Sequence, residues 1–169
     1  MEASPITVEV DVQEIAGAIA SPISEDTWSH WFQAWLTDLA PSLSPIGAYE
    51  LSLRLTTDAE VQQLNAQYRH IDRATDVLSF SAAAADIHLP ESLLAAMPFP
   101  LGDLVISLET ASMQAQQRQH SLSAELAWLA THGLLHLLGW DHPDEDQLQK
   151  MLQQQVNLLQ TVGLKVQYD

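Results

Sequence analysis

The segment LGDLVISL, residues 101–108, most constrains the fold of this 169-residue chain. It is a nearly unbroken apolar run of strand length. Such a run is typical of a β-strand that is buried on both faces. The segment therefore predicts an interior strand of a sheet that other elements cover on both sides.

Three other segments have the residue pattern of β-strands. ITVEVDV (6–12) and GAYELSLRL (47–55) alternate apolar and polar residues, as half-buried strands do, and DVLSF (76–80) is a shorter strand. Residues 81–100 contain three prolines and a run of alanines, so we expect an excursion or a loose hairpin there.

Helical patterns fill the intervals between these strands. Thr57 is a helix cap with Glu60 three residues later, and Pro143 and Asp144 open the last helix. The expected helices cover residues 27–40, 57–68, 109–119, 121–138 and 143–161. We therefore predict an α+β fold in a single domain, residues 1–169, with a mixed central sheet of three to four strands packed with about five helices.

The net charge excludes an extended nucleic-acid groove. Twenty-two acidic residues stand against six Lys and Arg, a formal charge of -16, which repels phosphate backbones. A local cationic site, supplied by a metal ion and a few arginines, is compatible with this charge. We expect no DNA binding.

Composition also limits the site chemistry and the location. The chain has no cysteine, so a transition-metal site must use histidines and carboxylates. No stretch reaches the roughly 18 apolar residues of a membrane-spanning helix. The acidic N-terminus lacks the regions of a secretory signal. We expect a cytoplasmic protein without a membrane partner.

The segment HGLLHLLGWDH, residues 132–142, is the most informative about chemistry. His132 and His136 are four residues apart on an expected helix, so they share one face with Cβ atoms roughly 6 Å apart. Gly139 permits the left-handed conformation that ends a helix, and His142 can then approach the same ion. Three imidazoles leave one position for water, as in catalytic zinc sites, and we predict one zinc ion per chain.

The spacing H-x3-H-x2-G-x2-H matches the zinc motif of metzincin metalloproteases except at Gly133. In those enzymes a glutamate follows the first histidine and serves as the general base of peptide hydrolysis. Its absence argues against an ordinary peptidase. We expect a metzincin-like zinc-binding helix that acts on another substrate.

A second candidate segment is YRHIDRATDVLSF, residues 68–80, which contains Arg69 and Arg73. A guanidinium near a zinc site suits a phosphodiester, because it can pair bidentately with phosphate oxygens. The same residues also fit a solvated turn with local Asp–Arg pairs. The residue pattern alone leaves both interpretations open.

Three motifs, YRHIDRATDVLSF, LGDLVIS and HGLLHLLGWDH, closely resemble those of the YbeY family of bacterial ribosomal-RNA maturation factors. The resemblance extends from about Asn65 to His142. It implies a zinc-dependent, single-strand-specific endoribonuclease that processes ribosomal-RNA termini, especially the 3′ end of 16S ribosomal RNA, and acts in ribosome quality control. Trp140 and Ala74 replace the tyrosine and the proline more usual in that family.

The resemblance also implies roles for individual residues. His132, His136 and His142 would be the zinc ligands, and Arg69 would be the active-site arginine. The expected substrate is single-stranded precursor ribosomal RNA, and the acidity fits docking on a ribosomal protein or a pre-ribosomal particle. The general base is not identified. Asp141 is expected to orient an imidazole N–H rather than to act in catalysis.

Two other functional classes remain open at this stage. The metzincin-like spacing also fits a metal-dependent peptidase or amidohydrolase. The acidity also fits a non-catalytic ribosome-assembly factor whose zinc is structural.

Overall fold

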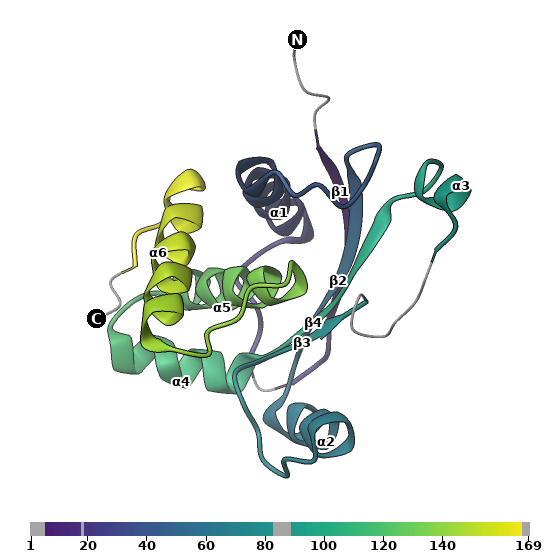
Figure 1. Cartoon of the computed structure of the whole chain (residues 1–169). Helices are drawn as coiled ribbons and strands as arrows, with labels where there is room; N and C mark the ends of the chain where they lie inside the picture. Colours follow the sequence, from purple (N-terminus) through teal and green to yellow (C-terminus); the bar gives the residue numbers. More distant parts are fainter. Residues whose placement is uncertain (1–5, 18, 83–88, 167–169) are drawn as a thin grey trace.

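Four strands form one mixed sheet in the computed structural model, which describes residues 6–17, 19–82 and 89–166 (Figure 1). The strand order is β1-β2-β4-β3. β1 (Thr7–Glu14), β2 (Ala48–Thr56) and β4 (Phe99–Ser107) run parallel, and β3 (Val77–Ser81) is antiparallel to β4. The predicted α+β class with a mixed sheet of three to four strands is confirmed.

The five expected helices are present, and the described residues contain one short helix more. The helices are α1 (Glu25–Leu39), α2 (Asp58–Arg69), α3 (Glu91–Leu94), α4 (Leu108–Arg118), α5 (Leu122–Leu137) and α6 (Glu145–Thr161). The residue pattern did not predict α3, which lies in the hairpin between β3 and β4. Residues 83–88 of that hairpin lie outside the described residues.

Side-chain caps fix where the helices begin. The hydroxyl of Thr57 accepts from the Glu60 N–H at 3.3 Å, and the Asp144 carboxylate accepts from the Gln147 N–H at 2.8 Å. These bonds satisfy backbone donors of the first helical turn, which have no partner within the helix. The predicted starts of α2 and α6 are therefore confirmed.

One face of the sheet is covered by the main core, and α2 covers part of the other face, as β4 shows. Leu104 and Ile106 lie in the main core, beneath α5, whereas Val105 packs on the opposite face with Val61 of α2. Alternate residues of a strand point to opposite faces, so a strand buried on both sides requires an unbroken apolar run. The prediction for residues 101–108 is confirmed for this part of β4.

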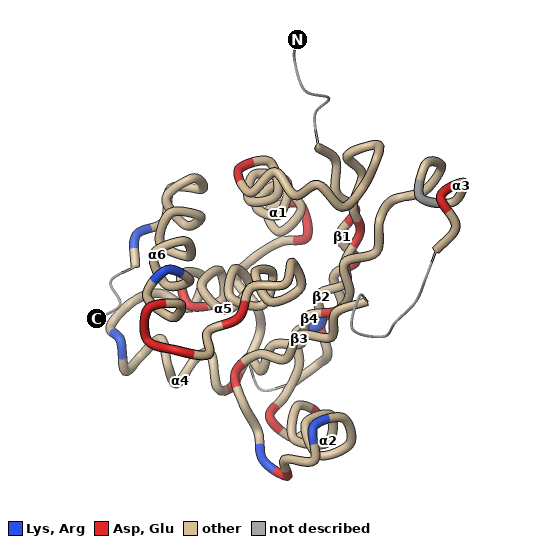
Figure 2. Tube along the Cα trace, in the orientation of Figure 1, with Lys and Arg blue, Asp and Glu red and all other residues tan. Residues whose placement is uncertain are grey.

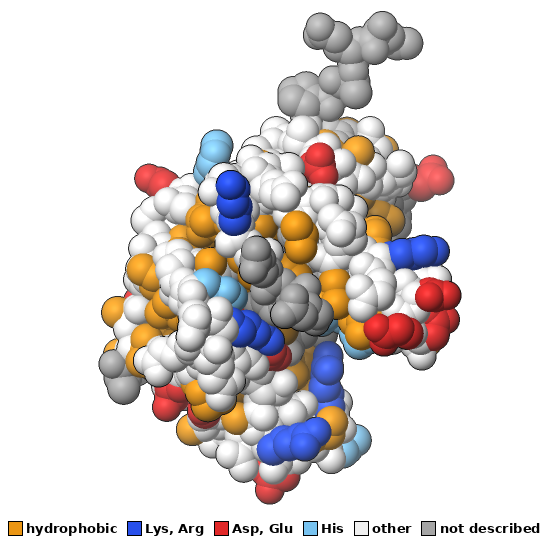
Figure 3. Space-filling view, turned by 90° about the vertical axis from the view of Figure 1, so that its left-hand side faces the viewer, with side chains coloured by type: hydrophobic (Ala, Val, Ile, Leu, Met, Phe, Trp, Pro, Cys, Tyr) orange, Lys and Arg blue, Asp and Glu red, His pale blue; other side chains and the backbone are white. Residues whose placement is uncertain are grey.

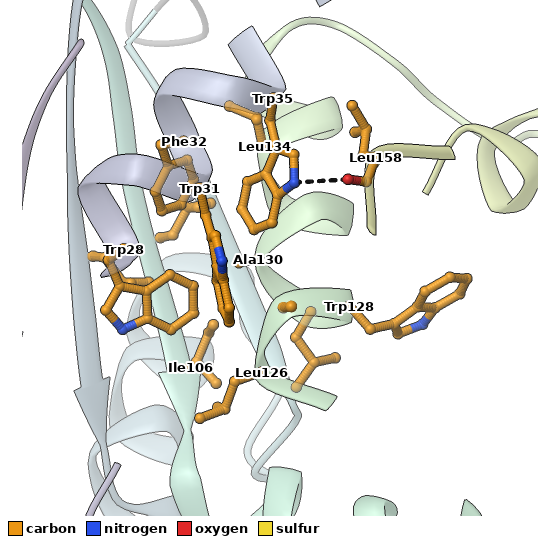
Figure 4. Close-up of a cluster of buried hydrophobic side chains, with 14 of the residues drawn as sticks. Trp28, Trp31, Phe32, Trp35, Ile106, Leu126, Trp128, Ala130, Leu134 and Leu158 are labelled. Atoms are coloured by element: carbon orange, nitrogen blue, oxygen red, sulfur yellow. Dashed lines mark hydrogen bonds between the residues drawn. The ribbon is translucent and has the colours of Figure 1, made fainter. Parts of the chain in front are cut away.

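The aromatic residues of α1 form the centre of the main core (Figure 4). Trp28, Phe32 and Trp35 are fully buried. The Trp35 indole N–H donates to the Leu158 carbonyl at 3.0 Å and so ties α1 to α6. These residues therefore belong to the core.

β3 is an edge strand, and its backbone matters for the site. Its two flanking bonds to β4 run from the Ser107 N–H to the Asp76 carbonyl and from the Ala82 N–H to the Leu101 carbonyl. In an antiparallel pair, successive residues point their backbone N–H and C=O alternately to the partner strand and away from it, so Ser79 turns these groups to the free edge.

Among the described residues, every helix is too short or too polar to cross a membrane.

Candidate metal centre

Three histidines converge at the C-terminal end of α5. His132 and His136 lie on the last turns of the helix, and His142 lies in the loop that follows. One ring nitrogen of each lies within 4.8 Å of one ring nitrogen of the others. The Nε2 atoms of His132 and His136 are 3.1 Å apart, close to the roughly 3.3–3.4 Å that tetrahedral coordination at 2.0–2.1 Å requires. This group could hold a metal ion.

A buried glutamine fixes the tautomer of His132. The Gln155 amide nitrogen donates to the Trp128 carbonyl at 3.1 Å, and this carbonyl can only accept. The Gln155 oxygen must then be the atom that faces the His132 Nδ1 at 3.1 Å, so Nδ1 carries the proton. The Nε2 lone pair is left free to point at a metal ion. Such support of a ligand imidazole is common around zinc.

The turn after α5 brings His142 back towards the helix. The Gly139 N–H donates to the His136 carbonyl at 3.0 Å, and the Trp140 N–H donates to the Leu135 carbonyl at 2.9 Å. This pair of bonds is a Schellman motif, which needs a left-handed residue at its centre. Gly139 has φ +95° and fills that position, so its predicted role in ending the helix is confirmed.

The electrostatics of the group favour neutral imidazoles. Burial lowers the pKa of His132 from its usual value, although its hydrogen bond to the Gln155 oxygen and the charge of Asp76 act in the opposite direction. Burial also lowers the pKa of His136, and the neighbouring His132 and His142 lower it further. Only a neutral imidazole has the lone pair that binds a metal, so both shifts favour metal binding near neutral pH.

Gly133 lies on the side of α5 that faces the sheet. A Cβ placed on it would meet the Leu104 Cδ2 at 2.6 Å and the Ser79 hydroxyl at 3.1 Å. Glycine lets the helix lie this close to β3 and β4 with these side chains in place. A glutamate would require Leu104, Ser79 or the helix to shift, so the departure from the metzincin pattern has a packing reason.

Arg69 is the last residue of α2 and is exposed. Its Nη2 donates to the Ser79 carbonyl at 3.2 Å, on the free edge of β3. The Ser79 hydroxyl in turn donates to the Gly133 carbonyl at 3.3 Å, next to His132. Arg69 is thus connected to the metal-binding turn of α5 through one residue of β3.

The arginines divide into two pairs by their partners. Arg54 is paired with Glu60, and Arg118 is paired with Glu125. Arg69 and Arg73 have no carboxylate partner within the described ranges, so the predicted local Asp–Arg pairs are absent there. A guanidinium without a carboxylate partner is available to pair with an anion such as a phosphate.

Charge is unevenly distributed over the surface. Along the chain trace, basic positions mark the end of α2 and the loop after it (Figure 2). In the space-filling view, basic side chains on the lower part of the face, at the height of α2, lie above an acidic side chain, and the acidic group on the right lies beside another basic side chain (Figure 3). Basic side chains are therefore present at the height of α2 although the chain is strongly negative.

Asp141 has a different partner from the one expected, and two residues that the sequence did not indicate, Gln155 and Asp76, lie near the histidines. The carboxylate of Asp141 accepts from the backbone N–H of His142 at 2.8 Å and supports the turn, whereas the imidazole partner is Gln155. Asp76, at the start of β3, lies close enough for its charge to act on His132. Its carboxylate also accepts from the Gln114 amide at 3.3 Å. Only the fold brings Gln155 and Asp76 to the histidines.

Comparison with known proteins gives a consistent result. Residues 15–163 match the family model described as endoribonuclease YbeY. Endoribonuclease YbeY of Trichormus variabilis is 52% identical over 173 residues, covering 95% of this chain and 97% of the relative. That of Acaryochloris marina is 59% identical over 141 residues, covering 83% of this chain and 79% of the relative.

A similar fold occurs in a solved structure. The solution structure of a Thermotoga maritima protein matches with a TM-score of 0.56 and 20% identity, covering 91% of this chain and 89% of that chain.

Proposed function

Because this chain belongs to the YbeY endoribonuclease family, we propose that it hydrolyses single-stranded RNA with one zinc ion held by His132, His136 and His142. The observation that carries the proposal is the convergence of three imidazole nitrogens, one of them on an exposed loop residue. Three neutral nitrogen ligands with an accessible side are the donor set of a catalytic zinc site. A zinc ion bound there would activate water and polarise a phosphoryl oxygen.

The protein residues divide the remaining tasks. Gln155 holds His132 in the tautomer that directs Nε2 to the ion, and the Gly139 turn brings His142 to it. Arg69 binds the phosphate at the cleaved bond, because its guanidinium lies beside β3 and has no carboxylate partner within the described ranges. A guanidinium can pair bidentately with the phosphate and stabilise the charge that develops in the transition state.

The substrate proposed is precursor ribosomal RNA, cut near the 3′ end of the 16S species during maturation and quality control. Residues 1–169 would form one hydrolase domain acting in the cytoplasm. Of the arginines in the described part of the chain, Arg69 and Arg73 are the two without a carboxylate partner. Few phosphates can therefore be neutralised, and free RNA should be bound weakly. Selectivity then comes from a ribosomal protein or a pre-ribosomal particle that presents the RNA end.

One panel tests this function against the two other classes. The purified protein is incubated with a single-stranded RNA, an RNA duplex and a casein-like peptide, each with and without a chelator. Cleavage of the single strand alone, lost with chelator and restored by zinc, is expected. Cleavage of the peptide would indicate a peptidase, and no cleavage of any substrate would indicate a binding protein with structural zinc.

A further inference from the structure

Tyr68 is unusually exposed for an aromatic residue. It immediately precedes Arg69 at the end of α2 and is 60% exposed. Its ring meets Phe80 of β3 in an edge-on arrangement, with ring centroids 5.5 Å apart and planes inclined by 68°. The contact with Phe80 supports the ring from one side, and most of the ring remains open to solvent.

A surface hollow of about 700 Å³ begins at this ring. It lies on the face of the sheet opposite α5, where α2 packs on β3 and β4. Its apolar lining includes Tyr68, Leu64, Phe80 and Val105, and its rim carries polar side chains of β2, β4 and α2. A flat apolar surface with polar groups around it is the environment that a nucleobase requires, because a base has an apolar face and polar edges.

The charges of the hollow favour a base over a phosphate. Arg54 and Glu60 pair with one another, with the Arg54 Nη2 donating to a Glu60 oxygen at 3.0 Å, and Glu60 has a lowered pKa mainly because of that bond. Asp103 adds one more carboxylate to the rim. The hollow is therefore net negative, which repels a phosphate, while the carboxylates can accept from amino groups on a base.

The adjacent residues complete the arrangement for a single strand. Tyr68 supplies a ring for a base, and Arg69, the next residue at the end of α2, supplies a cationic group for the backbone; Arg73 adds a second one in the loop that follows. Proteins that bind single strands combine cationic groups for phosphates with aromatic rings on which bases stack. A base in a duplex is already stacked and paired, so it cannot reach such a ring.

From this geometry we propose that Tyr68 and the hollow beside it bind one unpaired base of the RNA substrate, on the side of β3 opposite the metal centre. The inference rests on the proposed function, since it assigns a second contact of the same RNA. Tyr68 would act in substrate binding and in the preference for single strands, and not in the chemical step.

The test uses cleavage kinetics of the zinc-loaded protein on single-stranded RNA oligonucleotides. Tyr68→Ala should raise KM roughly 5- to 100-fold, the range expected for one base–aromatic stack, with little change in kcat. Tyr68→Phe should recover most of the affinity and Tyr68→Leu little of it. Ile46→Ala removes a side chain that is 45% exposed in the turn before β2, at the opposite end of that strand from α2, and serves as the matched control.

A second measurement identifies the base itself. Abasic nucleotides are placed at each position of the RNA in turn. At one position the abasic RNA should have a higher KM than the intact RNA for the parent protein. For Tyr68→Ala the two RNAs should have the same KM at that position. An unchanged KM for Tyr68→Ala, or a loss seen only with pre-ribosomal particles, would overturn the inference. If the parent fails to cleave intact RNA, the proposed function itself fails.

Discussion

The hydroxyl of Ser79 donates to the carbonyl of Gly133 at 3.3 Å, joining β3 to the helical turn that carries His132. The backbone carbonyl of Ser79 accepts a hydrogen bond from the guanidinium of Arg69 at 3.2 Å. One residue of an edge strand thus connects the metal-binding helix on one face of the sheet with α2, which packs on the other. Displacement of β3 would disturb both.

We expect the support of His132 by Gln155 to govern metal affinity. Gln155→Leu removes the acceptor of the Nδ1–H, so zinc affinity should fall by about 10- to 100-fold. Competition with a chromophoric chelator measures the change. Gln153→Leu, an exposed position two residues earlier on α6, is the control. Equal zinc affinity in Gln155→Leu and the parent would contradict the assignment.

Arg69 should affect cleavage and leave the fold intact. Its guanidinium is exposed and donates a hydrogen bond to a backbone carbonyl, so Arg69→Ala should retain the melting temperature and the zinc content of the parent. RNA cleavage should fall on the order of 100-fold or more. Arg69→Lys should recover only part, because an ammonium lacks the bidentate fork. A large drop in melting temperature for Arg69→Ala would indicate a structural role instead.

Gly133→Ala should destabilise the protein by overpacking. The added Cβ would lie 2.6 Å from the Leu104 Cδ2, and such insertions cost about 1–3 kcal/mol of unfolding free energy. Urea denaturation of the metal-free protein measures the cost. Adding Gly133→Ala to a Leu104→Ala background should cost less, because the colliding atom is gone. Equal costs in the two backgrounds would show that this contact does not limit the helix position.

The lowered pKa values of His132 and His136 predict the pH dependence of the metal-free protein. Both groups are easier to protonate in the unfolded chain, where the pKa is about 6.5. Their contribution to the stability of the folded protein is present above about pH 6.5, and it is lost as the pH falls from there towards the pKa values of the folded state.

Because other groups also titrate, the measured quantity is the melting temperature of the parent minus that of His136→Gln, from pH 7.5 to 5.5. This difference should decrease with falling pH. A constant or rising difference would contradict the direction of the shift.

Binding to free RNA should depend only weakly on salt. Contact with two or three phosphates predicts a slope of log affinity against log salt on the order of -1 to -2 for a single strand. Fluorescence anisotropy with a short labelled RNA gives the slope. A value steeper than about -5 would require a basic groove that the six Lys and Arg of the chain do not form.

Local sequence predicted the histidine group well, because its geometry depends on nearby residues. The period of a helix brings His132 to His136, and Gly139 permits the turn that returns His142. The endoribonuclease function, predicted from the motifs, is confirmed by the family match. The role of each histidine and of Arg69 stays a prediction.

The sequence does not indicate residues whose role depends on packing between segments that are far apart in the chain. Gln155 stands in a run of three glutamines, and only the phase of α6 against α5 buries this one beside His132. The metzincin pattern shows only that Gly133 replaces a glutamate, and the close packing of α5 on β4, which favours glycine there, cannot be seen in the local sequence. The short helix α3 was missed because four residues are too few for a helical period to show.

Metal binding and RNA cleavage require different amounts of the fold in this protein. The histidines all lie between residues 132 and 142, whereas Arg69 is connected to their helix only through β3, which pairs with β4 and contacts α5 at Gly133. A chain in which α5, its turn and α6 have assembled without the complete sheet could therefore still take up zinc. Metal content alone would then overstate how many molecules in a preparation are able to cut RNA.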